Sequence, residues 1–172
     1  LSYIERFRRE AQSAAGLVQA NIVQIYEVGE VEGYHFIAQE YVAGRNLRQY
    51  LGRYGAVESV MAVNVIRQVA MALQKAGEMN VIHRDIKPEN IILTGLSIEE
   101  AEVMLIDFGV ASTAGVSQDT TVVQGRTLVG TPAYMSPDQG RGVPYDRRSE
   151  VYSLGCVLYE ALSGRPPFDA ED

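Results

Sequence analysis

The sequence holds one cysteine, Cys156, and two histidines in 172 residues, and it has no long uncharged run. One cysteine excludes an internal disulfide and a multi-cysteine zinc site, and it suits a reducing compartment. Two histidines leave no histidine-rich metal cluster. The roughly 18 apolar residues of a membrane span are missing, and residues 1–10 are too charged for a secretory signal. We therefore expect a soluble, cytoplasmic chain that makes no membrane contact.

Positive charge is also scarce: the net charge is −7 and the isoelectric point is about 4.9. This balance argues against nucleic acid as a partner. Hydrophobic residues make up 47% of the chain, which excludes a disordered sequence and suits one domain with a buried core. Because the chain starts at Leu1 inside an expected helix and stops soon after a Gly-Arg-Pro-Pro-Phe turn, we expect a segment of a longer protein.

The hydrophobic pattern predicts helices and short strands in alternation, an α+β fold. Apolar residues three and four apart indicate helices, and short β-branched runs between turn residues indicate strands. The expected helices cover residues 3–15, 47–50, 59–79 and 149–162, and the expected strands cover residues 22–28, 34–37, 91–93 and 103–106. Ser59 is the expected N-cap of the third helix, and Asn80 is its expected stop.

Two longer stretches stand apart from this pattern. Residues 109–142 show no periodicity and are predicted to form a long functional or disordered loop. Residues 149–162 are apolar on every side, which predicts a helix in the middle of a core.

The chemistry is concentrated in the run His83–Asn90, which reads HRDIKPEN, and in Asp107–Gly109, which reads DFG and follows an apolar strand. A lone DFG is weak, but the two runs in this order are a specific signature of phosphoryl transfer. The chain resembles the eukaryotic-type protein kinase family from Glu10 to Phe168, and its wording is most similar to bacterial Ser/Thr kinases. Further landmarks are the strand into the hinge at residues 34–42, the end of the activation segment at residues 130–138 and the start of helix F at residues 149–155.

This resemblance implies an incomplete protein-kinase-like fold. Residues 1–41 would be a remnant of the N-lobe from helix C to the hinge, with part of its sheet. Residues 42–172 would be the mainly helical C-lobe through helix F.

The resemblance also implies the roles of four residues in transfer of the ATP γ-phosphate. Asp85 would orient the substrate hydroxyl and accept its proton, and Lys87 would place a cation beside the moving phosphoryl group. Asn90 and Asp107 would hold Mg²⁺, which prefers oxygen ligands. His83 would be structural, stacked beneath Phe108, and not a proton carrier.

ATP would be held by residues on both sides of the hinge. By resemblance, the backbone of Glu40 and Val42 meets the adenine edge, next to the gatekeeper Gln39. Ile92 would lie under the adenine ring, although plain strand core explains it equally well. Glu10 matches the glutamate of helix C that pairs with the ATP-binding lysine of a strand, although a solvated helix glutamate explains it too.

Regulation and substrate class follow from the activation segment. Arg84 before the catalytic aspartate is typical of kinases that are switched by phosphorylation of this segment, and Thr127 matches the common phosphosite best, ahead of Thr120 and Thr121. Thr131 in Gly-Thr-Pro and Lys87 are the Ser/Thr-kinase forms. The expected partners are protein substrates with Ser or Thr, including a second copy of the protein in trans.

The sequence departs from the family in several places. It has no Gly-rich phosphate loop and no strand lysine for Glu10, so this segment is expected to bind ATP poorly and to be weak or inactive. Asp138 replaces the usual Glu, and Glu150 replaces the usual Asp at the start of helix F. The extra methylene of Glu150 is expected to displace its carboxylate. The 94–102 connection is a few residues longer than is usual in the family. Helix 149–162 is expected to expose an apolar patch and to favour aggregation.

Two other functions stay open. One is a pseudokinase, a binding or scaffolding module without phosphoryl transfer, because the strand lysine is missing. A small-molecule phosphotransferase of related fold is the other, and Arg84 and the Gly-Thr-Pro run speak against it.

Overall fold

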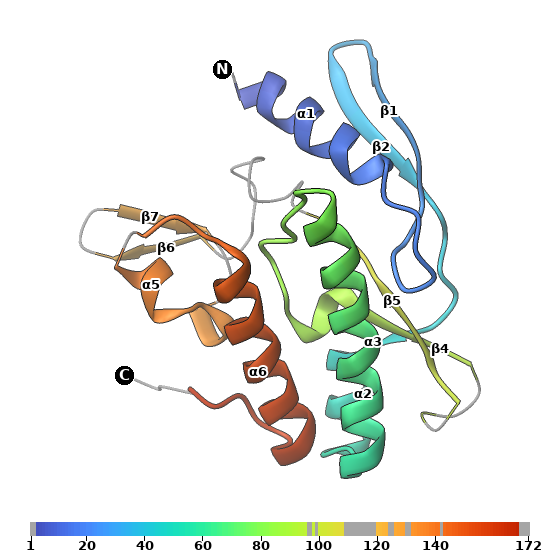
Figure 1. The fold of residues 1–172 in the computed structure, drawn as a ribbon, viewed down its shortest axis with the longest axis vertical. Helices are drawn as coiled ribbons and strands as arrows, with labels where there is room; N and C mark the ends of the chain where they lie inside the picture. Colours follow the sequence, from blue (N-terminus) through green and yellow to red (C-terminus); the bar gives the residue numbers. More distant parts are fainter. Residues whose placement is uncertain are drawn as a thin grey trace.

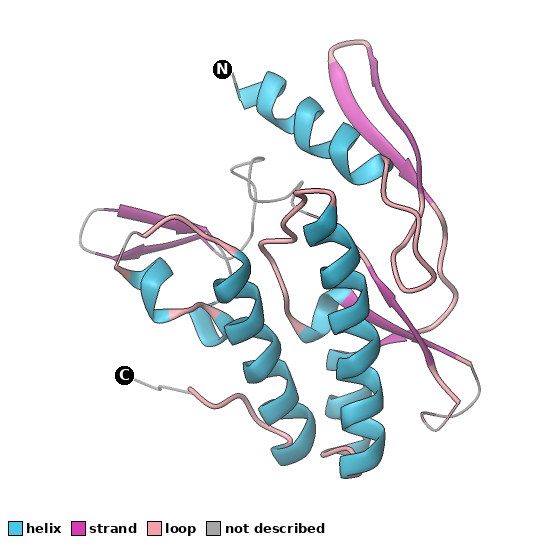
Figure 2. Cartoon of the chain, viewed as in Figure 1, coloured by secondary structure: helices cyan, strands magenta, loops and turns pink. Residues whose placement is uncertain are grey.

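The computed structural model describes residues 3–95, 98, 100–108, 120–123, 126–129, 132–141 and 143–168. Their elements are α1 (Tyr3–Ala15), β1 (Ile25–Val31), β2 (Tyr34–Gln39), β3 (Arg45–Asn46), α2 (Leu47–Tyr54), α3 (Ser59–Glu78), the 3₁₀ turn η1 (Pro88–Asn90), β4 (Ile91–Thr94), β5 (Glu102–Leu105), β6 (Thr120–Val123), β7 (Arg126–Val129), the 3₁₀ turn η2 (Pro132–Tyr134), α5 (Pro137–Gly140) and α6 (Arg147–Ser163). Small sheets and a mainly helical part make up the predicted α+β fold (Figures 1 and 2). None of the helices in these ranges is long and apolar enough to cross a bilayer.

Helix α1 and the β1–β2 hairpin form one end of the molecule (Figure 1). The strands pair antiparallel, with Val31 opposite Tyr34. Glu32 and Gly33 between them both have positive φ, 51° and 83°, which matches the twist of a tight hairpin turn. The predicted helix and hairpin are confirmed, although β1 begins and ends three residues later than expected.

Helix α3 supplies the long wall of the core at the other end. Its buried residues recur every three or four positions, as the sequence predicts: Ala62, Val65, Val69, Ala72 and Ala76. The N-cap is Glu58 and not Ser59, because the Glu58 carboxylate accepts hydrogen bonds from the first backbone N–H groups. Asn80 ends the helix as predicted, with a φ of 58° that asparagine tolerates better than most residues.

Strands β3, β4 and β5 form a small antiparallel sheet that joins the two ends. Asn21, in the segment after α1, accepts a hydrogen bond from the Leu105 N–H at 2.8 Å and donates its side-chain N–H to the Val103 carbonyl at 2.9 Å. The segment before the hairpin is thus fixed to β5, the strand that leads to Asp107. The division of the chain at residues 41 and 42 stays a prediction.

The stretch 109–142 is more ordered than its composition suggests. The β6–β7 hairpin, η2 and α5 all lie within it. The prediction of a loop without regular structure is therefore wrong for these described parts. The reason is that this ribbon is defined by backbone pairing between its two strands, which the spacing of apolar residues does not report.

Helix α6 begins two residues earlier than predicted, since Asp146 accepts hydrogen bonds from the N–H groups of Arg148 and Ser149. Its buried side carries polar as well as apolar residues: Ser149, Glu150, Ser153, Cys156, Val157, Glu160 and Ala161. On the opposite side Val151 is 70% exposed, and Leu162 is also exposed. The helix is therefore not enclosed on all sides by the described residues. Its exposed apolar strip agrees with the expected patch, and aggregation stays a prediction.

Candidate active site

The loop between α3 and η1 is fixed by a buried histidine. His83 is fully buried, and its Nε2 lies 2.8 Å from the Ile106 carbonyl oxygen while its Nδ1 accepts the Asp85 N–H at 3.2 Å. This pairing requires the neutral tautomer with the proton on Nε2. Burial accordingly lowers the pKa of His83 to about 4. The ring centroid lies 4.6 Å from that of Phe108, so the two rings are in contact as predicted, but their planes are tilted by 56° and not stacked.

Glu150 on α6 binds the backbone of the same loop. Its Oε1 accepts the His83 N–H at 2.5 Å and the Arg84 N–H at 3.4 Å. Arg84 has a φ of 70°, so the loop adopts a backbone conformation that needs such support. The longer side chain of Glu150 therefore still reaches the loop. Burial raises the pKa of Glu150 to about 7, although the two backbone hydrogen bonds oppose the shift.

Asp85, Lys87 and Asn90 form a compact group at the surface of this loop. The Lys87 Nζ lies 3.1 Å from the Asp85 Oδ2, and these side chains are 15% and 19% exposed. The Asn90 Nδ2 donates to the Asp85 carbonyl at 2.8 Å and to its Oδ2 at 3.1 Å. A carboxylate is thus held next to a cation, as the sequence predicts, and the Asn90 amide fixes its orientation.

Asp107 joins the group from the end of β5. The Asn90 carbonyl accepts the Ile106 N–H at 3.0 Å, which ties this strand end to the loop. The pKa of Asp107 is raised, first by desolvation and then by the Asp85 carboxylate, whereas Lys87 and a hydrogen bond with Gln39 lower it. The two carboxylates are therefore close enough to repel each other. Together with the bond between Ile106 and Asn90, this interaction places Asp107 beside the loop that carries Asp85.

The donor set of this site fits Mg²⁺ with a nucleotide. The Asn90 side-chain nitrogen donates to Asp85, so its side-chain oxygen, Oδ1, is the atom left for a metal. A bound cation would also relieve the repulsion between the Asp85 and Asp107 carboxylates. Across the described residues, no three His, Cys, Asp or Glu side chains gather to hold a metal by themselves. The remaining ligands would have to come from phosphates and water, as is usual for Mg²⁺.

Comparison with known proteins decides the family. The family model for the protein kinase domain matches residues 2–172. The chain belongs to the protein kinase family. It is 39% identical over 169 residues to the serine/threonine-protein kinase PrkC of Bacillus subtilis, covering 98% of this chain and 25% of PrkC. It is 41% identical over 171 residues to PknB of Mycobacterium leprae, covering 97% of this chain and 26% of PknB.

Solved kinase structures agree with the fold. The crystal structure of the Mycobacterium tuberculosis PknI kinase domain matches with a TM-score of 0.76 at 28% identity, over 97% of this chain and 60% of that one. The fold is thus a partial α+β kinase fold. The chain spans about a quarter of the length of the curated relatives it matches.

Glu10, which the resemblance matches to the glutamate of helix C, has an unexpected partner. The Arg84 Nη1 donates to the Glu10 Oε1 at 2.5 Å, which fixes α1 to the catalytic loop. The resemblance instead implied a strand lysine as the partner of Glu10. The second oxygen, Oε2, is buried, and the described part of the chain offers it no hydrogen bond.

The predicted adenine-side residues lie along the connection from β2 to β3. The Glu40 N–H donates to the Gln24 carbonyl at 2.8 Å, and Val42 and Ile92 are half-buried. Gly44 brings this connection against β4, because a side chain there would clash with Ile92 and the backbone of Leu93. The connection thus passes the strand that carries Ile92. Adenine contacts stay a prediction.

The structure describes only some of the predicted regulatory threonines. Thr127 lies in β7 opposite Val122, and only its backbone is described. Thr131 lies outside the described residues. Asp138, one of the departures from the family, approaches Arg141 one turn away at 3.7 Å on an exposed surface.

One partly buried charged cluster was not predicted. Arg48, Glu89, Tyr134 and Glu160 meet beside the catalytic loop. The available signal was Glu160, an acidic residue inside an otherwise apolar helix pattern, which requires a buried partner. No local pattern identifies that partner.

The two titrations of His83 and Glu150 give a test by pH. The lowered pKa of His83 costs stability as pH falls from about 6.5 to 4, whereas the raised pKa of Glu150 adds stability as pH falls from about 7 to 4.5. Glu150→Gln keeps an acceptor and removes the second effect. Relative to wild type, its unfolding free energy should therefore fall by about 3 kcal/mol more between pH 7 and 4.5.

Urea unfolding at several pH values measures this difference. Glu27→Gln, on an exposed strand face, is the matched control and should follow wild type. Parallel stability curves for wild type and Glu150→Gln would show that Glu150 is not held with a raised pKa.

Proposed function

We propose that this chain forms the catalytic core of a kinase that transfers the γ-phosphate of ATP to Ser and Thr hydroxyls of proteins. One observation supports the proposal: Lys87 and Asn90 contact the Asp85 side chain, and the strand end next to Asp107 is bonded to Asn90 through Ile106. Support also comes from the relatives, which are named Ser/Thr protein kinases.

The chemistry follows from the placement of these side chains. The substrate hydroxyl oxygen forms a bond to the γ-phosphorus, the bond to the bridging oxygen of ADP breaks, and the hydroxyl proton passes to Asp85. Lys87 lies beside Asp85, where its ammonium neutralises charge on the transferring phosphoryl group. Asn90 and Asp107 would hold Mg²⁺, which supplies charge neutralisation on the ATP phosphates when bound.

The proposal extends to a switch at Arg84. In the structure its guanidinium is paired with Glu10. A phosphate on Thr127 carries about −1.5 to −2 charge and would compete with the single charge of Glu10 for this guanidinium. Phosphorylation would then order the activation segment and release Glu10 together.

Transfer of radiolabelled phosphate from ATP by the full-length protein tests the proposed function. The label should appear on Ser and Thr residues of a general protein substrate. It should also appear on a second, inactive copy of the protein. Phosphoamino-acid analysis identifies the labelled residues. ATP binding without any transfer would instead support a pseudokinase.

The switch has its own variant. Thr127→Ala should lower the transfer rate about 5- to 150-fold, the usual range of an allosteric coupling. Thr120→Ala and Thr121→Ala are matched controls and should stay near wild type. An unchanged rate in Thr127→Ala, with no phosphate at Thr127 by mass spectrometry, would refute the switch.

A further inference from the structure

A second charged group lies beside the catalytic residues and takes no part in the mechanism above. We call it the Arg48 cluster: Arg48 on α2, Glu89 in η1, Tyr134 in η2 and Glu160 on α6. The Arg48 Nε donates to the Glu89 Oε1 at 2.8 Å, and its two terminal nitrogens donate to Glu160 and to the Tyr134 hydroxyl. The Tyr134 hydroxyl in turn donates to the Glu160 Oε2 at 2.5 Å. One guanidinium therefore joins four separate elements.

The burial of Glu160 and Tyr134 makes Arg48 important to the cluster, although the side chains of Arg48 and Glu89 are each 39% exposed. Glu160 is 1% exposed and Tyr134 is 3% exposed. A buried carboxylate is costly unless it is paired and hydrogen-bonded, and Arg48 and Tyr134 supply both needs. Burial alone would lower the pKa of Arg48, but the hydrogen bonds to Glu89 and Glu160 outweigh it and the pKa is raised. The guanidinium is thus permanently charged.

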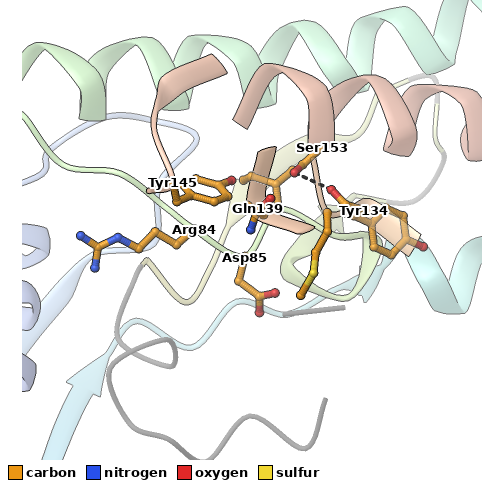
Figure 3. A pocket seen from close by; sticks show the side chains of 8 residues that line it. Arg84, Asp85, Tyr134, Gln139, Tyr145 and Ser153 are labelled. Atoms are coloured by element: carbon orange, nitrogen blue, oxygen red, sulfur yellow. Dashed lines mark hydrogen bonds between the residues drawn. The ribbon is translucent and has the colours of Figure 1, made fainter. Parts of the chain in front are cut away.

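The cluster reaches the pocket that contains Asp85 through one member, Tyr134. Asp85 and Tyr134 line the same pocket, together with Met135 and Gln139 (Figure 3). Glu89 belongs to the catalytic loop, four residues after Asp85. Ser153 of α6 also donates to the Tyr134 carbonyl at 2.7 Å, which fixes the backbone of the opposite wall (Figure 3). Arg48 therefore connects the loop that carries the proton acceptor to the segment that faces it.

We propose that Arg48 is a positioning residue that sets the spacing between Asp85 and the 132–136 segment, and thereby presents the substrate hydroxyl to Asp85. The inference rests on the proposed function, because it assigns the 132–136 wall to the bound protein substrate. The role requires the planar fork of arginine, since the guanidinium reaches Glu89, Glu160 and Tyr134 at once. Lysine keeps the charge but has no such fork.

The test is Arg48→Lys in the full-length protein, with three readouts. For a peptide substrate, kcat/KM should fall about 10- to 100-fold, because a displacement near 1 Å has effects of this size. The KM for ATP, and the rate of ATP hydrolysis with water as acceptor, should stay within about twofold, since water needs no peptide wall. Arg53→Lys on the same helix, whose guanidinium lies over the Tyr54 ring, is the matched control and should match wild type.

A second measurement separates positioning from folding. Arg48→Ala leaves Glu160 buried without its cation, so Arg48→Ala is assayed with and without added guanidinium ion. Guanidinium should restore part of the peptide rate, as expected when the missing group acts through its own hydrogen bonds. The double variant Arg48→Met with Glu160→Gln removes both charges together and should fold, yet keep the peptide defect.

The outcomes are distinct. If Arg48→Lys retains the peptide kcat/KM, or if peptide phosphorylation and water hydrolysis fall by the same factor, the positioning role is wrong. If the wild-type protein transfers no phosphate to any hydroxyl, the proposed function is wrong and this role falls with it.

Discussion

Asp85→Asn is expected to lower the rate of phosphoryl transfer about 10²- to 10⁴-fold, the usual contribution of a positioned proton acceptor. The amide has nearly the same shape as the carboxylate and can still meet the Asn90 side chain. It cannot accept the hydroxyl proton, and it removes the negative partner of Lys87. Because Asp85 is not among the proposed metal ligands, affinity for ATP with Mg²⁺ should change only a few-fold.

Single-turnover transfer of labelled phosphate by the full-length protein measures this effect. Asp138→Asn is the matched control, since Asp138 is exposed and its ion pair with Arg141 lies on the surface. A transfer rate in Asp85→Asn equal to that of wild type would remove Asp85 from the mechanism.

Asp107→Asn is expected to have the second large effect, on metal dependence. Loss of the one carboxylate among the proposed ligands should raise the Mg²⁺ concentration for half-maximal transfer by at least about 10- to 100-fold, since even outer partners of a metal site have effects of that size. Stability should not fall, because burial and then the nearby Asp85 carboxylate disfavour the ionised Asp107 side chain and raise its pKa.

Two measurements check this prediction: transfer rate against Mg²⁺ concentration, and urea unfolding without metal. Glu102→Gln, at the exposed start of β5, is the control. An unchanged Mg²⁺ curve in Asp107→Asn would mean that the metal is held elsewhere.

Local patterns predict most of the fold. Helix α1 and the hairpin follow from apolar spacing and turn residues, and α3 ends within one residue of its expected stop. Helix starts are less certain: Glu58 caps α3 where Ser59 was expected, and α6 begins after its cap Asp146, two residues before the predicted start. A cap is chosen by the geometry of one turn, and several neighbouring residues have suitable side chains.

The catalytic group is predictable because its chemistry is concentrated in two short runs of sequence. The way these residues come together cannot be predicted from the two runs. Asp107 lies near Asp85 only because β5 returns beside the loop. The long-range pairs are invisible in the sequence. Arg48 and Glu160 are 112 positions apart, and Glu10 and Arg84 are 74 apart.

The central claim is that Asp85 and Asp107 act on the same phosphoryl group, and a double-mutant cycle tests it most directly. Single-turnover rates are measured for wild type, Asp85→Asn, Asp107→Asn and the double variant at one Mg²⁺ concentration. Residues that act as a unit are strongly non-additive, so the double variant should be little slower than the slower single variant. A double variant slowed by the full product of the two single effects would show that the two carboxylates act independently, and would contradict a shared site.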